Sequence, residues 1–207
     1  MIDHAGDAHA EAEAEAFKLE PAEPTPDRVE RADLDYYPTP ASAVLPILPF
    51  LSPGRAVLDP ACGRGELLAH FDRRTKLGIE LDPTRAADTR RAPGVKSVTC
   101  GDALVEGWPD ADLVICNPPF SHSLEFARRA VEWASSGRGR TAAILLRLSF
   151  LESEERREFH RAAPSDVYVL ANRPKFRPNR HGKMATDSVT CAWFVWSPGG
   201  GGRWRVL

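Results

Sequence analysis

Short strand-like runs alternate with helix-like segments from residue 36 onward, and this rhythm limits the fold more than any other feature of the sequence. Seven runs are expected to be strands: residues 55–59, 77–81, 95–102, 111–117, 141–148, 166–170 and 189–196. Helices are expected over residues 66–71, from residue 82 onward, and over 124–134 and 152–162. Such alternation favours a mostly parallel sheet with helices on both faces. Because no helical pattern separates the last two strands, they are expected to form an antiparallel edge hairpin in an α/β, Rossmann-like sheet of seven strands.

The composition excludes several classes of protein. Of the 207 residues, 43% are hydrophobic and 27% are charged, which is typical of a globular domain. No apolar run reaches the roughly 18 residues that a membrane-spanning helix needs, so no membrane association is expected. The four cysteines, Cys62, Cys100, Cys116 and Cys191, form no Cys-x-x-Cys pair. Neither a disulfide framework nor a zinc or other metal site is therefore expected, and the reducing cytoplasm is the expected location.

Charge is distributed unevenly along the chain. Residues 1–35 hold 11 acidic and three basic residues, so this stretch carries −8 while the whole chain carries −2. The stretch is rich in Ala, Glu and Pro and has almost no large apolar side chains, so it cannot bury enough surface to offset its ordering entropy. We expect a disordered acidic tail over residues 1–35 and one folded domain over residues 36–207. A tail that competes with a polyanion, or that docks a partner, is the alternative to a solvated leader.

A glycine-containing turn, DPACGRGE, follows the first expected strand at residues 59–66. Gly63 and Gly65 allow the backbone to approach a ligand closely at the carboxyl edge of the sheet. The third glycine of a dinucleotide fingerprint is absent, because Leu68 stands at its position. The acid Asp59 precedes the glycines, and a carboxylate suits a cationic or hydroxyl-bearing ligand better than a pyrophosphate. A purely structural turn is the alternative.

Two further acids stand at the ends of the next two expected strands. Glu80 lies 21 positions after Asp59, where a carboxylate can accept hydrogen bonds from ribose hydroxyls, and Asp102 is placed to accept from an exocyclic amine. Each acid alone is more often a helix cap or a turn former. Together, the three acids predict a pocket for a cation that contains adenosine.

The segment Asn117-Pro118-Pro119-Phe120 is the most specific motif in the chain. Neither proline has an N–H group, and both restrict the backbone, so the carbonyl of Pro118 is held in one direction. The Asn117 amide adds a second acceptor, and Phe120 adds a flat apolar face. Two acceptors and a ring suit a planar NH2 group, whose nitrogen becomes more nucleophilic when both hydrogens are bound. A rigid loop without chemistry is the alternative.

A basic stretch without any acid occupies residues 171–183. Its candidate nucleic-acid contacts are Arg173, Lys175, Phe176, Arg177, Arg180 and Lys183. Cations beside an aromatic ring suit a loop that contacts phosphates and a base opened out of the stack. A solvated hairpin loop is the alternative.

Taken together, these motifs resemble the class I S-adenosylmethionine-dependent methyltransferases that act on amino groups. The closer resemblance is to small phage- and prophage-type N6-adenine DNA methyltransferases. The segments YYPTP at residues 36–40 and GKMATDSVTCAWFVW at residues 182–196 support this closer match, which covers about residues 36–197. Pro46 and Pro49 interrupt the helix expected after Thr39, and no large target-recognition domain is evident.

The resemblance assigns roles to individual residues. It implies a cofactor site made of Tyr37, Thr39, Asp59, Ala61, Cys62, Gly63, Gly65, Glu80, Leu81, Asp102 and Ala103. Within that set, Thr39 would bind the methionine carboxylate, Glu80 the ribose, and Asp102 the adenine amine. Asn117 and Pro118, with Pro119, would orient the target amine, and Phe120 would stack on the flipped base.

The sequence therefore predicts methyl transfer from S-adenosylmethionine to the N6 amine of adenine in DNA. An amine of RNA and the side-chain amide of a protein glutamine are alternative targets, because the same loop can hold them. A catalytically silent subunit that binds the cofactor or DNA is an alternative of another class. The basic loop favours nucleic acid as the partner.

Overall fold

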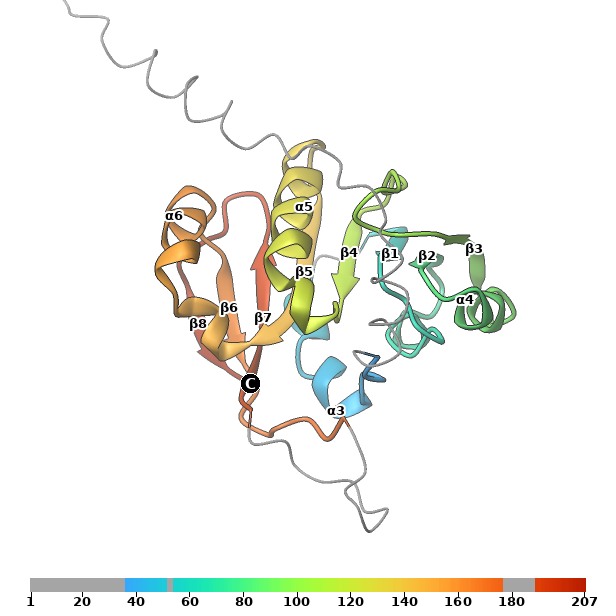
Figure 1. Cartoon of the computed structure of the whole chain (residues 1–207), viewed down its shortest axis with the longest axis horizontal. Coiled ribbons are helices and arrows are strands. Elements are labelled where there is room, and N and C mark those ends of the chain that lie inside the picture. Colours follow the sequence, from blue (N-terminus) through green and yellow to red (C-terminus); the bar gives the residue numbers. More distant parts are fainter. Residues whose placement is uncertain (1–35, 52–53, 177–188) are drawn as a thin grey trace, which may run out of the picture.

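The computed structural model describes residues 36–51, 54–176 and 189–207. In these residues a single eight-stranded sheet has the order β3-β2-β1-β4-β5-β7-β6-β8 (Figure 1). Its strands are β1 Ala56–Asp59, β2 Thr75–Glu80, β3 Val95–Cys100, β4 Leu113–Cys116, β5 Thr141–Arg147, β6 Asp166–Val169, β7 Cys191–Trp196 and β8 Trp204–Val206. Strand β7 is antiparallel to both neighbours, β5 and β6, and all other pairings are parallel. The predicted mostly parallel α/β sheet is confirmed.

The predicted strand count of seven is wrong by one. The antiparallel pair of β6 and β7 forms as expected, but β8 adds to β6 and becomes the edge of the sheet. Strand β8 has three residues, all exposed, so it has no alternation of buried and exposed positions. A run this short without that alternation gives no strand signal in the sequence.

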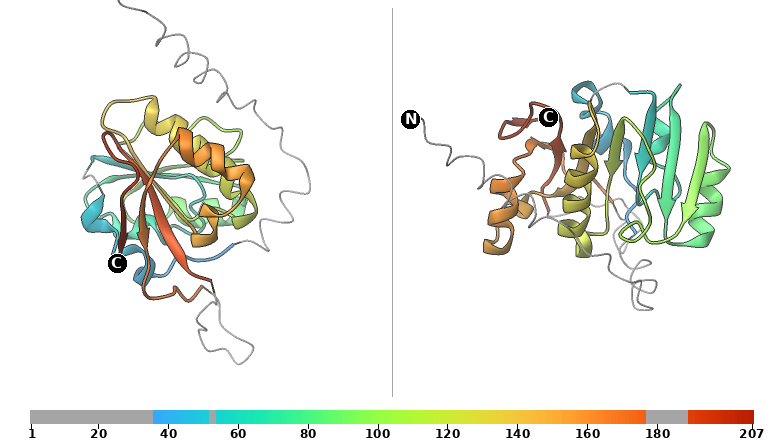
Figure 2. Two further views of the ribbon diagram at one scale, coloured as in Figure 1. Left: turned by 90° about the vertical axis from the view of Figure 1, so that its left-hand side faces the viewer. Right: turned by 90° about the horizontal axis from the view of Figure 1, so that it is seen from above.

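Helices cover both faces of the sheet, as predicted. Helices α5 (Ser123–Ser135) and α6 (Glu154–Ala162) lie on one face, and the left view of Figure 2 shows α3 (Ala41–Val44) on the opposite side. Helix α4 (Pro83–Arg90) packs on the α3 face through Ala86. It begins where the sequence predicts, because the Asp82 side chain accepts a hydrogen bond from the Arg85 N–H at 2.7 Å.

One predicted helix does not form. Residues 66–71 contain only a short 3₁₀ turn, Leu68–His70, rather than the expected helix. Gly63 and Gly65 both have positive φ, at 54° and 87°, and Arg73 has a φ of 61°. These residues of positive φ lie on both sides of Leu68–His70 and leave room for only one tight turn before the chain enters β2.

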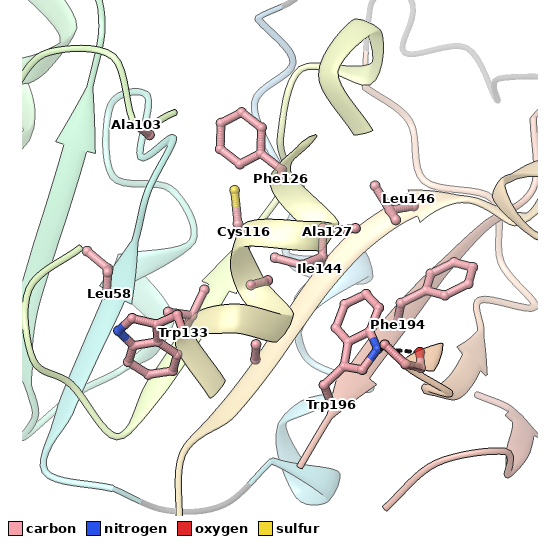
Figure 3. Packing of buried hydrophobic residues seen from close by; sticks show 14 of the residues in the cluster. Leu58, Ala103, Cys116, Phe126, Ala127, Trp133, Ile144, Leu146, Phe194 and Trp196 are labelled. Atoms are coloured by element: carbon pink, nitrogen blue, oxygen red, sulfur yellow. Dashed lines mark hydrogen bonds between the residues drawn. The ribbon is translucent and has the colours of Figure 1, made fainter. Parts of the chain in front are cut away.

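Two clusters of buried hydrophobic side chains form the core, one on each face of the sheet. Around α5, the buried side chains include Trp133, Ile144 and Phe194, and Trp196 donates to the Ala163 carbonyl at 3.1 Å (Figure 3). On the other face, Trp193 donates to the Ala43 carbonyl at 2.8 Å and so ties α3 to the sheet. Successive odd and even residues of β7 thus complete opposite layers, as the odd spacing of the tryptophans predicts.

The buried stripe of α5 is offset from the expected one. A 3.6-residue period through the apolar positions predicts a stripe of Leu124, Ala127, Val131 and Ala134. The buried side chains of α5 are instead Phe126, Ala127, Ala130 and Trp133, and the other three predicted residues pack partly buried at the margin. The two large rings bury more apolar area than the aliphatic alternatives, and this decides the rotation of the helix.

The described ranges contain neither a membrane-spanning helix nor a cluster of metal-binding side chains. None of their helices is both long and apolar enough to cross a membrane. No group of three His, Cys, Asp or Glu residues in the same ranges could hold a metal ion. The predicted acidic tail, residues 1–35, lies outside the described residues.

Candidate functional site

A cleft of about 890 Å³ lies at the carboxyl edge of the sheet, beyond the ends of β1, β2 and β4. Twelve residues named from the sequence line it: Tyr37, Thr39, Asp59, Ala61, Cys62, Gly63, Glu80, Leu81, Asp102, Ala103, Asn117 and Pro119. The strand ends thus bring the predicted cofactor residues and the Asn117 loop into one space. Gly65, Pro118 and Phe120 do not line it.

Asp59 is the most strongly perturbed acid of the cleft. Its side chain is 1% exposed, and burial raises the pKa of the carboxyl from an ordinary 3.8 to about 8. The Ala61 N–H at 3.1 Å and the Cys116 thiol stabilise the anion, but they do not offset the loss of water. Glu80, nearby, raises the pKa of Asp59 further. A cation bound in the cleft would ionise Asp59.

Glu80 is buried and already holds three donors. Its Oε1 accepts from the Asp82 N–H at 2.9 Å and from Arg85 Nε at 3.1 Å, and its Oε2 accepts from the Gly63 N–H at 2.8 Å. A carboxylate offers about four acceptor positions. The carboxylate can therefore accept about one more hydrogen bond, which is less than the pair of ribose hydroxyls that the sequence suggests.

Gly63 requires glycine for two reasons. Its φ of 54° is left-handed, and a Cβ at this position would lie 2.6 Å from the ring of Tyr36. Tyr36 donates to Glu66 Oε1 at 2.5 Å, and the Arg85 guanidinium lies 4.8 Å from the centre of the Tyr36 ring. This contact holds the segment before α3 against the glycine turn.

Asn117 combines a fixed orientation with an unpaired acceptor. Its Nδ2 donates to the Tyr37 carbonyl at 3.1 Å and to Thr39 Oγ1 at 3.0 Å. Its Oδ1 is buried and has no hydrogen-bond partner among the described residues. An unmet buried acceptor costs about 1–3 kcal/mol. Oδ1 is therefore an acceptor that the described residues leave unused.

The Phe120 ring belongs to an aromatic group next to the cleft. Its centroid lies 5.7 Å from that of Tyr37 and 6.4 Å from that of Phe176. Phe176 is 5% exposed, so it packs inside this group. The sequence predicts instead a ring on an open loop that could stack on a base. The guanidinium of Arg147 lies over the Phe120 ring, 4.8 Å from its centroid.

The rest of the predicted nucleic-acid loop is only partly described. Arg173 and Lys175 are exposed, on the segment between β6 and Phe176. Arg177, Arg180 and Lys183 lie outside the described residues.

Cys62 and Cys116 lie close to Asp59, and their burial does not favour the thiolate that a nucleophile needs. Both side chains are buried, and burial raises the pKa of each thiol above its ordinary value. Both thiols stay protonated near neutral pH, so their role is packing and, for Cys116, donation to Asp59.

Several lining residues could not be chosen from the sequence. They are Tyr36, Glu66, Arg85, Ser121, His122 and Phe126. Tyr36 stands inside the YYPTP segment and Glu66 ends the glycine turn, so their positions are adjacent to motifs. Arg85 and Phe126 reach the cleft from the first turns of α4 and α5, where an ordinary helical pattern gives no signal.

Comparison with known proteins identifies relatives of the fold. No model of a known protein family matches the chain. A curated protein of Pyrobaculum islandicum, assigned as ribosomal RNA small subunit methyltransferase A, is 38% identical over 71 residues, which are 33% of this chain and 30% of that protein. The solved structure of a modification subunit, assigned to a type I restriction enzyme of Vibrio vulnificus, has a TM-score of 0.55 and 16% identity over 97% of this chain and 51% of that one. A TehB-like S-adenosylmethionine-dependent methyltransferase of Corynebacterium glutamicum has a TM-score of 0.51 and 16% identity, over 92% and 98% of the two chains.

These two superpositions, each over nine-tenths or more of the chain, decide the fold. The chain has the fold of class I S-adenosylmethionine-dependent methyltransferases. It spans less than a third of the length of the curated relative and about half of the restriction-modification subunit.

Proposed function

We propose that this protein transfers a methyl group from S-adenosylmethionine to the N6 amine of adenine in DNA. The observation that carries the proposal is the buried, unpaired Oδ1 of Asn117 beside a cleft lined by acids. The cleft belongs to a fold shared with an S-adenosylmethionine-dependent methyltransferase. An acceptor with no partner supports a donor-bearing substrate at this point.

The residues of the cleft fit S-adenosylmethionine by their charge and by the hydrogen-bond acceptor positions that they leave open. Asp59 is buried with a pKa of about 8, so a positive ligand stabilises its ionised form and gains a desolvated counter-charge. Glu80 retains about one acceptor position for a hydroxyl, and Asp102 and Leu81 line the same cleft. When bound, S-adenosylmethionine supplies a methyl group activated by its positive sulfur.

The chain would promote the reaction mainly by positioning. Thr39 and the Tyr37 carbonyl take both hydrogens of the Asn117 amide, so Oδ1 cannot turn away from the cleft without losing two bonds. Oδ1 would accept one hydrogen of the target amine, and the second is assigned to the Pro118 carbonyl, as the sequence predicts, although Pro118 does not line the cleft. Binding both hydrogens favours a pyramidal nitrogen and directs its lone pair towards the methyl group. Alignment of this kind accounts for a large part of many enzymatic accelerations.

Nucleic acid is the proposed substrate because of charge. The acidic stretch over residues 1–35 leaves the remainder of the chain with a net charge of +6. Arg173 and Lys175 are exposed and shortly precede Phe176, whose ring lies next to that of Phe120. Such a surface suits a polyanion better than a protein glutamine. The structural similarity to a restriction-modification subunit favours DNA.

RNA is a second candidate, supported by one specific observation. The curated relative that is 38% identical over 71 residues is assigned as a ribosomal RNA methyltransferase. An amine of RNA would meet the same acceptors as an amine of DNA. The two candidates differ in the polymer that approaches the cleft, and not in the chemistry at Asn117.

One assay separates the candidates. The purified chain is incubated with S-adenosylmethionine labelled on its methyl group and, separately, with DNA, ribosomal RNA, transfer RNA and a protein extract. Label in DNA, recovered after digestion as N6-methyladenine, is the expected result. Label in RNA alone would favour the second candidate, and label in protein alone would overturn the nucleic-acid proposal. DNA retention without label in any sample would favour a silent subunit.

Asn117→Ala tests the central observation. The variant should lose turnover, because one of the two acceptors is gone, while it still binds the cofactor within about threefold. Its urea unfolding should stay cooperative, which shows that the loss is not a loss of fold. Turnover that survives in Asn117→Ala would refute the role given to this loop.

A further inference from the structure

Arg147 lies beside the proposed amine site and has no role in the function described so far. It ends β5, which pairs in parallel with β4, so its position is at the same sheet edge as Asn117. Its side chain is exposed, and its guanidinium lies 4.8 Å from the centre of the Phe120 ring. No carboxylate in the described ranges forms an ion pair with it. As far as the described residues go, Arg147 is thus a cation without a paired carboxylate, and it lies over the Phe120 ring.

The guanidinium occupies a place that a flat substrate ring would need. The Phe120 ring packs against Tyr37, at an interplanar angle of 38°, and against Phe176, at 84°. The Arg147 guanidinium lies over the same ring. A base that stacks on Phe120 from solvent must therefore displace this guanidinium, which then needs another partner.

We propose that Arg147 binds a backbone phosphate next to the target nucleotide, and that it leaves the Phe120 ring when the base arrives. This inference rests on the proposed function and narrows its substrate to a polynucleotide. A guanidinium stays charged at all relevant pH values, and its planar fork matches two phosphate oxygens. The base replaces the guanidinium on the Phe120 ring, and the phosphate becomes the new partner of the guanidinium. The ring and the cation therefore both keep a partner.

The first test measures binding of single-stranded oligonucleotides to the unaltered chain, Arg147→Ala and Arg147→Lys between 50 and 200 mM salt. Each phosphate contact on a single strand contributes about 0.7 to the slope of log affinity against log salt. Arg147→Ala should lower the slope by that amount, so that its affinity falls about 2.5-fold less than the affinity of the unaltered chain across this range. Arg147→Lys should keep the slope, because the charge remains.

Arg138 provides a matched control. It is an exposed arginine just before β5, at the opposite end of the strand that Arg147 ends. Arg138→Ala removes the same charge from the chain but not from the site, so its slope should equal that of the unaltered chain. Equal slopes for Arg138→Ala and Arg147→Ala would overturn the proposal.

The second test asks whether the phosphate and Arg147 act on each other. An oligonucleotide with one adenine is compared with a copy in which uncharged methylphosphonates replace the phosphates on either side of that adenine. The substitution should weaken binding to the unaltered chain and have a smaller effect on Arg147→Ala, because the partner is already missing. An equal loss in both proteins would mean that Arg147 only supports the Phe120 ring, and the proposal would fail.

The design separates this inference from the proposed function. If the unaltered chain binds neither DNA nor RNA oligonucleotides, the nucleic-acid substrate is wrong, and the role of Arg147 is refuted with it. If it binds and methylates one of them but the slope is insensitive to Arg147→Ala, only the role of Arg147 is refuted. Parallel DNA and RNA series show which polymer supplies the phosphate.

Discussion

Replacing Asp59 by Asn should stabilise the unliganded protein near neutral pH. The carboxyl is buried and its pKa is raised to about 8, whereas in the unfolded chain it returns to about 3.8. The folded state therefore holds one more proton than the unfolded state between these two pH values. Stability must fall as pH rises through this window, because unfolding releases the proton. Asn has nearly the same shape and carries no charge, so it removes this penalty.

The size of the effect follows from the two pKa values. Each pKa unit corresponds to about 1.4 kcal/mol of free energy. The stability of Asp59→Asn relative to the unaltered chain should thus increase by between about 2 and 3 kcal/mol from pH 5 to pH 7. The gain should be small near pH 4, where the unfolded carboxyl is also protonated, and level off above pH 8. Asn can still accept from the Ala61 N–H, so that bond cancels in the comparison.

Urea unfolding of both proteins at pH 5, 6, 7 and 8 measures this difference. Comparing the two proteins at each pH removes the contribution of every other titrating group that they share. A difference that does not vary with pH would refute the reasoning, because it would mean that Asp59 is ionised in the folded protein with an ordinary pKa. The same variant should bind S-adenosylmethionine at least tenfold more weakly, an estimate for the loss of one buried counter-charge.

Four further predictions concern the cofactor, the turn, the core and the loop. With a pKa of about 8, about nine-tenths of Asp59 is protonated at pH 7. Binding of S-adenosylmethionine should therefore release nearly one proton, and binding to Asp59→Asn should release none. Calorimetry in two buffers measures this release. Gly63→Ala should weaken cofactor binding at least tenfold, because a side chain at this left-handed position introduces strain of about 1–2 kcal/mol. Gly107→Ala is the control, because a Cβ there meets nothing within 4 Å. Trp193→Phe should lower the free energy of unfolding in urea by about 1–3 kcal/mol, because the Ala43 carbonyl loses its donor, and unchanged stability would contradict that assignment. Joint replacement of Arg177 and Arg180 by Ala should reduce the salt dependence of DNA binding, and an unaltered salt slope would make this loop ordinary surface.

Sequence reasoning was most effective where the position along a strand determines the position in space. Parallel strands end at one edge of the sheet, so acids at or near the ends of strands were predicted to meet, and Asp59, Glu80 and Asp102 do line one cleft. The start of α4 was also predictable, because capping by Asp82 depends on residues only three apart. Both features follow from local chemistry and from the alternation of elements.

Features that depend on contacts between distant segments were not predictable. Phe176 was expected on an open loop, but it is buried against Tyr37 and Phe120, which are far away in the sequence. The 3₁₀ turn at Leu68–His70 depends on left-handed residues on both sides, and a short apolar run cannot show this. Arg85 fills acceptor positions of Glu80 only because α4 packs where it does.

The place of β7 has a consequence for how a nascent chain becomes a finished sheet. Strands β5 and β6 are made first, but each keeps an unpaired edge until residues 191–196 enter between them. The cleft-bearing strands β1, β2 and β4 are complete long before that moment. Until then, the free edge of β5, both edges of β6 and two unfilled tryptophan positions are exposed, and open edges recruit strands from other chains. Association of incomplete chains through these edges should thus lower the yield of the folded protein.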